Sequence, residues 1–106
     1  MGAETDLLVV YCTASPEEGD ALARALVEEG LAACVNIASV RSCYIWEGKV
    51  NQDPEALLII KTTRGRFEAL RKRIVELHSY SLPEIIALPV AEGHKPYLDW
   101  LARSVG

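Results

Sequence analysis

The sequence predicts an α+β fold, in which one antiparallel β-sheet is covered by helices. Two observations lead to this prediction. Short, apolar, β-branched segments alternate with segments of helical periodicity, and two long central strands are joined by turn residues rather than by a helix. The 106 residues form one domain, residues 1–106, because this length supports one hydrophobic core and is too short for two.

The first strand and the first helix have clear ends. The stretch DLLVVYCT is short, apolar and β-branched, which is typical of a buried strand. In the following SPEEGDALARALVEEG, Ser15 can cap a helix, Pro16 suits the first helical position, and Glu18 completes a capping box. Gly30 can end the helix. We therefore predict a strand and then a helix that runs from Ser15 to Gly30.

A long strand, LAACVNIASVRSCYIW, comes next. Its apolar residues first occupy one face and then the other, in the order Val35 and Ile37, then Val40, Tyr44 and Trp46. One strand cannot bury both sets against a single layer, so we predict a bulge or bend near Ala38 and Ser39. The turn-rich EGKVNQDP then forms a long tip, and EALLIIKTT returns as the second strand of a hairpin.

The last third of the chain predicts a helix, a strand and a short terminal helix. From Gly65 the apolar period becomes helical, and one face carries Phe67, Leu70, Ile74, Leu77 and His78. The stretch EIIALPV reads as a fourth strand, and its Pro89 predicts an edge position or a strand end. KPYLDWLARSV is a helix with Pro96 at its start.

This order of elements predicts a ferredoxin-like βαββαβ sandwich with a long bent β-hairpin and an extra C-terminal helix. Two of the strands, Leu7–Val10 and Leu57–Ile60, are apolar on both faces, whereas a sheet with one wet face should alternate. The terminal helix is too short to cover the whole second face. We therefore predict a closed homo-oligomer that buries it.

Composition excludes several classes of function. The net charge of −4 and the lack of a clustered basic face argue against nucleic-acid binding. No apolar run approaches the roughly 18–20 residues of a membrane span, so we expect no membrane association. The N-terminal MGAETDLL carries acids where a signal peptide would be basic, which predicts a cytoplasmic protein.

The sequence gives little support for an enzyme. It contains no P-loop, HExxH, nucleophile elbow or dinucleotide-binding fingerprint. Three cysteines without a CxxC pair indicate neither a disulfide framework nor a zinc knuckle. Cys12 and His78 could form a thiolate and imidazolium pair, but no third group is available to orient them. We predict a protein without catalytic activity.

Several segments together resemble the divalent-cation tolerance family CutA. They span the chain in order: CTASPEE, LAACVNI, YIWEGKV, ALLIIKTT, HSYSLPEIIALPV and YLDW. The resemblance implies a ferredoxin-like fold, a tightly packed homotrimer, and cytoplasmic binding of copper or other divalent cations. The family most often has His-Pro-Tyr where this chain has His78, Ser79 and Tyr80, and Leu77 stands where some members carry a second histidine.

The predicted metal ligands are Cys12, His78 and Glu84, which come from three different segments. A thiolate with an imidazole suits copper and, less well, zinc or another divalent cation. Each residue also has an ordinary structural interpretation. Cys12 can be core packing, His78 a hydrogen-bonded turn histidine, and Glu84 the partner of a basic residue or of backbone donors.

A second class of function is a trimeric signalling module that binds a small metabolite in clefts between subunits. The candidate cleft residues are Trp46, Lys61 and Tyr80. Trp46 could stack on a ligand or pack in the hairpin, and Lys61 could neutralise a carboxylate or an anionic ligand, or simply extend to solvent at a strand end. A purely structural assembly protein is the third alternative.

Overall fold

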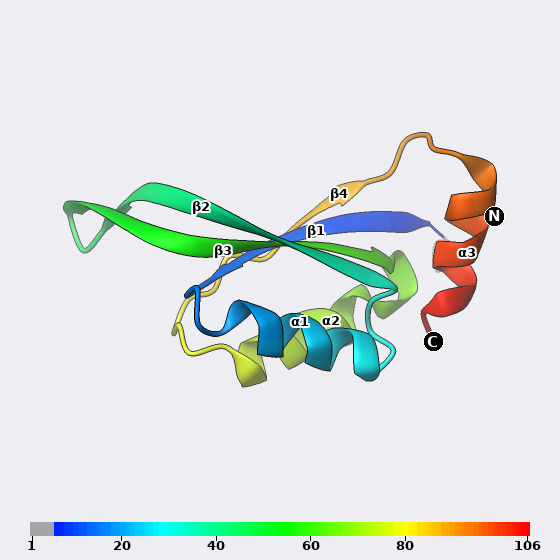
Figure 1. Cartoon of the computed structure of the whole chain (residues 1–106), viewed down its shortest axis with the longest axis horizontal. Helices are drawn as coiled ribbons and strands as arrows, with labels where there is room; N and C mark the ends of the chain where they lie inside the picture. Colours follow the sequence, from blue (N-terminus) through cyan, green and yellow to red (C-terminus); the bar gives the residue numbers. More distant parts are fainter. Residues whose placement is uncertain (1–5) are drawn as a thin grey trace.

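The computed structural model describes residues 6–106 and contains the predicted elements in the predicted order (Figure 1). In chain order they are β1 (Leu7–Ala14), α1 (Gly19–Glu28), β2 (Cys34–Trp46), β3 (Lys49–Thr63), α2 (Arg64–Leu77), β4 (Ile86–Pro89) and α3 (Lys95–Ser104). The strands form an antiparallel sheet in the order β2-β3-β1-β4. Helices α1 and α2 cover one face, so the α+β ferredoxin-like prediction is confirmed.

The core lies between this face and the two helices. Alternate residues of β1 and β3 point toward the helices and are fully buried, as are the helix side chains that meet them: Val10, Cys12, Leu58, Ile60, Leu26, Leu70 and Ile74. Burial of each such Leu, Ile or Val side chain contributes roughly 1.5–3 kcal/mol to folding. The buried Thr62 hydroxyl donates to the Leu31 carbonyl at 2.7 Å, so this polar group is also satisfied.

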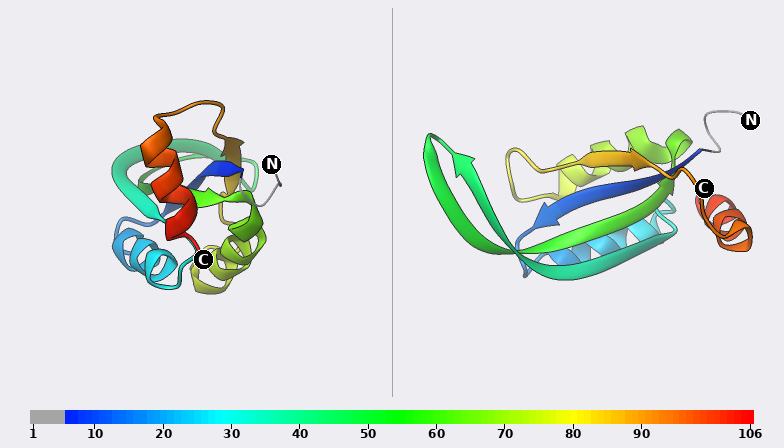
Figure 2. Two further views of the ribbon diagram at one scale, coloured as in Figure 1. Left: turned by 90° about the vertical axis from the view of Figure 1, so that its right-hand side faces the viewer. Right: turned by 90° about the horizontal axis from the view of Figure 1, so that it is seen from above.

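Of the bulge or bend predicted in β2, the structure has a bend and no bulge. The pairing of β2 with β3 continues without an extra residue past Ala38 and Ser39, from Cys34 opposite Lys61 to Trp46 opposite Lys49. Both strands curve together as they extend beyond the helices (Figure 2). The apolar residues of β2 change face without a bulge because the outer half of the hairpin extends beyond the helices. In that half no helix covers the sheet, so the apolar side chains need not point toward the helix side.

The predicted long hairpin tip is also wrong. Only Glu47 and Gly48 form the turn, and residues 49–54 already belong to β3. Both turn residues have positive φ, 51° and 78°, as a two-residue turn with the twist of the strands requires. The polar residues between Lys49 and Pro54 therefore lie on an exposed strand rather than in a loop.

Helix α1 begins later than the capping signal predicted. Its first residue is Gly19, and the Glu18 N–H donates to the Ser15 carbonyl at 3.1 Å without any side-chain cap. Residues 16–18 form a turn before the helix, so the predicted capping box is wrong. The helix end is confirmed, because Gly30 adopts a φ of 73°. Pro89 is the last residue of the edge strand β4, as predicted.

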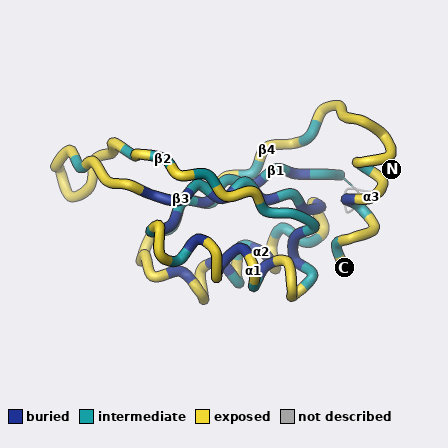
Figure 3. The backbone as a smooth tube through the Cα atoms, viewed as in Figure 1, coloured by how far each residue is buried: buried dark blue, intermediate teal, exposed yellow. Residues whose placement is uncertain are grey.

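Within residues 6–106, α1 and α2 lie on the first face of the sheet, α3 stands at one end of the strands, and no helix lies over the rest of the second face (Figures 1 and 3). We call it the open face. Its apolar residues on the four strands include Val9, Tyr11, Ala38, Leu57, Ile59, Ile86 and Leu88. The side chains of Ile86 and Leu88 are 52% and 44% exposed. This surface is the apolar surplus that the sequence predicted for oligomerisation.

Candidate functional site

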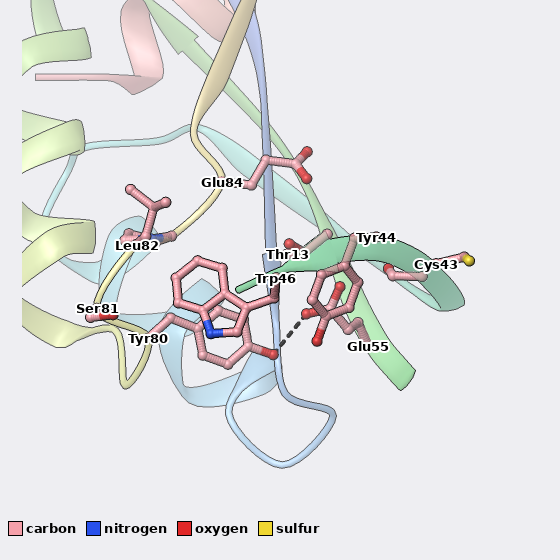
Figure 4. Close-up of a pocket in the computed structure, with 11 residues that line it drawn as sticks. Thr13, Cys43, Tyr44, Trp46, Glu55, Tyr80, Ser81, Leu82 and Glu84 are labelled. Atoms are coloured by element: carbon pink, nitrogen blue, oxygen red, sulfur yellow. Dashed lines mark hydrogen bonds between the residues drawn. The ribbon is translucent and has the colours of Figure 1, made fainter. Parts of the chain in front are cut away.

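A pocket of about 710 Å³ opens where the β2–β3 hairpin leaves the body of the domain (Figure 4). One wall comes from the hairpin and the end of β1, and the other from the loop between α2 and β4. The lining residues are Thr13, Ser42, Cys43, Tyr44, Trp46, Glu55, Tyr80, Ser81, Leu82, Pro83 and Glu84. A cavity of this size holds a small molecule.

Two tyrosines of the site are fixed by carboxylates. The Tyr80 hydroxyl donates to Glu55 Oε2 at 2.7 Å, and the Tyr44 hydroxyl donates to Asp53 Oδ2 at 2.6 Å. Burial, and then the bond to Glu55, raises the pKa of Tyr80 well above its usual value. The bond to Asp53 raises the pKa of Tyr44. Both phenols therefore keep their protons at neutral pH.

The pocket is negatively charged. Glu55 and Glu84 line it, and within residues 6–106 neither carboxylate forms an ion pair with a lysine or arginine. Glu18, at the start of α1, has a buried Oε1 atom that lacks a hydrogen-bond partner among the described residues. The lining contains no basic side chain. The site therefore favours cations over anions.

Cys12 lies beneath this pocket and is completely buried. Burial, and then the negative charges of Glu84, Glu55 and Glu18, together raise the pKa of its thiol to about 12. Its Sγ lies 3.7 Å from the Thr13 carbonyl oxygen, which the protonated thiol can use as an acceptor. Cys12 is therefore a neutral thiol at physiological pH, and a metal would have to displace its proton.

His78 connects α2 to the end of β1. Its Nε2 lies 2.8 Å from the Thr13 carbonyl oxygen, and its Nδ1 accepts the Tyr80 N–H at 3.0 Å. Since a carbonyl only accepts, Nε2 must carry the proton, which fixes the tautomer. The ring also packs on Tyr80 with centroids 4.6 Å apart. Both ring nitrogens are thus occupied, and a metal would have to replace one of these bonds.

The chain brings some of the predicted site residues together and separates others. Trp46, Tyr80 and Glu84 share the pocket, whereas Cys12 and His78 meet below it at the Thr13 carbonyl. Lys61 pairs with Val9 and Cys34 farther along β3 and does not line the pocket. No three histidine, cysteine or acidic side chains in the described part of the chain form a metal-binding cluster.

Among the pocket residues that were not predicted from the sequence are Cys43, Tyr44 and Glu55. Glu55 carried a usable signal, because it shares a strand face with Leu57 and Ile59, and a carboxylate on an apolar face is unusual. Cys43 and Tyr44 had none, since only the curvature of the hairpin brings them to the loop after α2.

No helix within residues 6–106 is long and apolar enough to cross a membrane. Three cysteines are free thiols in the described region: Cys12 is buried, Cys34 half-buried and Cys43 exposed.

Comparisons with known proteins agree with this architecture. The family model "CutA1 divalent ion tolerance protein" matches residues 7–104. The divalent-cation tolerance protein CutA of Thermus thermophilus is 49% identical over 100 residues, which is 93% of this chain and 97% of that protein. The chloroplastic CutA of Arabidopsis thaliana is 48% identical over 92% of this chain, which spans only 54% of that longer protein.

Solved structures show the same similarity. CutA1 from Oryza sativa superposes with a TM-score of 0.93 and 44% identity, covering 99% of this chain and 98% of that one. The Thermus thermophilus protein gives a TM-score of 0.90 with 50% identity, covering 94% and 99%. A PII-like CutA from Nostoc gives 0.90 with 36% identity, covering 93% and 97%. The chain therefore belongs to the CutA1 divalent ion tolerance protein family.

Proposed function

We propose that this protein is a non-catalytic homotrimer that binds copper or other divalent cations in the pocket beside the hairpin. The observation that carries the proposal is a cavity lined by two carboxylates, Glu55 and Glu84, that lack basic partners among the described residues. Carboxylate oxygens are ligands for divalent cations, and Glu55 and Glu84 bring two such groups to one pocket.

The open face supports the assembly. Exposed Ile86 and Leu88, together with half-buried Val9 and Tyr11, make a face that a second copy of the chain can cover. A closed ring would also bring a neighbouring subunit toward the pocket, because the pocket and the open face lie on the same side of the sheet. A neighbour could then supply the ligands that one chain lacks for a complete coordination shell.

The arrangement around Thr13 supports the proposed absence of catalysis. A Cys–His nucleophile needs the imidazole to take the thiol proton, but the His78 Nε2–H is directed at the Thr13 carbonyl. Burial meanwhile holds the pKa of Cys12 near 12, so the thiolate is scarce. Neither residue is prepared for covalent chemistry.

We propose a cytoplasmic location, supported by the three free thiols, which suit a reducing compartment. Relatives are described as chloroplastic in Arabidopsis and periplasmic in Archaeoglobus fulgidus, so the compartment differs among members of the family.

The test is native mass spectrometry under anaerobic conditions, with and without copper or zinc. We expect a mass of three subunits and one bound ion for each pocket in the wild type. Glu84→Gln should reduce metal occupancy at least fivefold, because the substitution removes a charged ligand and retains the shape of the side chain. Glu92→Gln, in the exposed loop before α3, is the matched control and should bind like the wild type.

Cys12→Ser and His78→Ala in the same titration test the ligands predicted from the sequence. If Glu84→Gln kept full metal occupancy and Cys12→Ser lost the metal, the ion would be bound in the core at Cys12 and not in the pocket. A monomeric mass at micromolar concentration would contradict the assembly.

A second candidate function is a small-metabolite-binding signalling protein. It is favoured by the size of the pocket and by its three aromatic side chains, Tyr44, Trp46 and Tyr80, which a metal ion does not need. It predicts thermal stabilisation by an organic ligand without any requirement for copper.

A further inference from the structure

We propose that the pocket beside the hairpin recognises an organic ammonium cation, with aromatic rings on its walls and carboxylates balancing the charge. This inference rests on the second candidate function, small-metabolite binding, and assigns the chemical class of the ligand. It does not require that a metal ion binds.

The aromatic walls carry the first step. Tyr44 and Trp46 reach the pocket from β2, and Tyr80 reaches it from the loop after α2 (Figure 4). Trp46 remains 46% exposed and Tyr44 40% exposed, so their rings are accessible to a ligand. The faces of aromatic rings attract cations, and indole attracts them most strongly.

The hydrogen bonds of the tyrosines strengthen this attraction. Each phenol donates its proton to a carboxylate, Tyr80 to Glu55 at 2.7 Å and Tyr44 to Asp53 at 2.6 Å. Donation to a negative acceptor leaves more electron density on the phenol ring and fixes its orientation. The rings are thus prepared for a positive group before any ligand arrives.

The charges determine which metabolites fit. Glu55 lies beside the aromatic rings and Glu84 lies on the other side of the pocket (Figure 4). No lysine or arginine of one chain lines the cavity within the described residues, and the two carboxylates repel a phosphate or a carboxylate ligand. Within a single chain the pocket therefore disfavours nucleotides and organic acids and favours cations.

Hydration separates an organic ammonium ion from a bare metal ion. Rings cannot complete a metal coordination shell, and a small divalent ion gives up its water reluctantly. An alkylated ammonium is weakly hydrated and apolar on its surface, so it gains from both the rings and the carboxylates. The two kinds of cation share Glu55 and Glu84 and should therefore compete.

The test is isothermal titration of the intact protein with choline and with 3,3-dimethyl-1-butanol, a neutral molecule of the same shape. We expect choline to bind about tenfold more tightly than the neutral analogue, since only choline has the charge. Trp46→Leu and Glu55→Gln should each weaken choline binding at least fivefold. Trp100→Leu, a tryptophan on α3 outside the pocket, should leave it unchanged.

Equal binding of the two molecules, or no binding of choline, would overturn the inference, and this comparison needs only the wild type. Native masses and melting temperatures of the variants show whether a loss of binding is a loss of fold. The two proposals can fail separately: choline binding without copper binding removes the metal function, and copper binding without choline binding removes this inference.

Discussion

At the residue scale, the carbonyl of Thr13 connects the site to the core. His78 donates to it from Nε2 at 2.8 Å, and the Cys12 thiol lies 3.7 Å from it. Through Nδ1, the same imidazole also holds the backbone of Tyr80, whose hydroxyl reaches Glu55. His78 therefore positions one wall of the pocket, which explains a buried histidine beside a site without requiring it to be a ligand.

The buried Cys12 thiol predicts a pH dependence of stability. Its pKa is about 12 in the folded protein and 9.0 by its ordinary value, so folding favours the protonated form. The stabilisation of the folded protein by this thiol is fully present below pH 9 and is lost as the pH rises toward 12. Between pH 8 and pH 10.5 the free energy of unfolding should therefore fall by roughly 2 kcal/mol from this group alone, measured by urea denaturation.

The comparison with variants isolates this contribution. Cys12→Ala should lose less stability over the same pH interval than the wild type, whereas the exposed Cys43→Ala should show the wild-type slope. The same slope in Cys12→Ala and in the wild type would mean that Cys12 is not the group responsible.

At the element scale, the pocket depends on how α1 and the hairpin meet the sheet. Gly19, the first residue of α1, lies so close to β3 that an added Cβ would be 2.9 Å from the Cβ of Ala56. The neighbouring Glu55 belongs to the pocket, so the packing of α1 and the position of the site are linked.

Gly19→Val should destabilise the protein by about 1–3 kcal/mol, because the new side chain has no space between α1 and β3. Ala21→Val, on the exposed side of the same helix, is the matched control and should change stability by about 0.5 kcal/mol or less. Urea midpoints at one protein concentration give the comparison. Equal urea midpoints for the two variants would show that α1 can shift away from the sheet to accommodate valine with little loss of folding free energy.

The elements also show what a sequence can predict. The strands and helices were predicted from the periodicity of apolar residues. Gly30 marked the end of a helix, because its φ of 73° is a left-handed conformation that favours glycine. The capping box failed because residues 16–18 form a turn and the helix begins at Gly19, which packs closely on Ala56 of β3. The predicted bulge or bend is a bend without a bulge, because β2 and β3 curve as a pair, which no single-strand pattern reveals.

At the scale of the whole molecule, one face of the sheet is covered by α1 and α2, and the other is the open face. The sequence predicted this asymmetry, because Leu57–Ile60 is apolar on both sides while the helices can cover only one. It predicted Trp46, Tyr80 and Glu84 among the site residues, and these share the pocket. It could not predict that Lys61 lies apart or that Cys43 and Tyr44 join, because these depend on strand register and hairpin curvature.

We propose that the assembled protein binds cations in pockets beside its hairpins. The most direct measurement is anomalous diffraction at the copper edge from crystals of the protein soaked in copper. We expect three chains that cover one another's open faces, with an anomalous peak near Glu55 and Glu84 in each pocket. A peak at Cys12 with none in the pocket, or an assembly that leaves Ile86 and Leu88 in solvent, would contradict it.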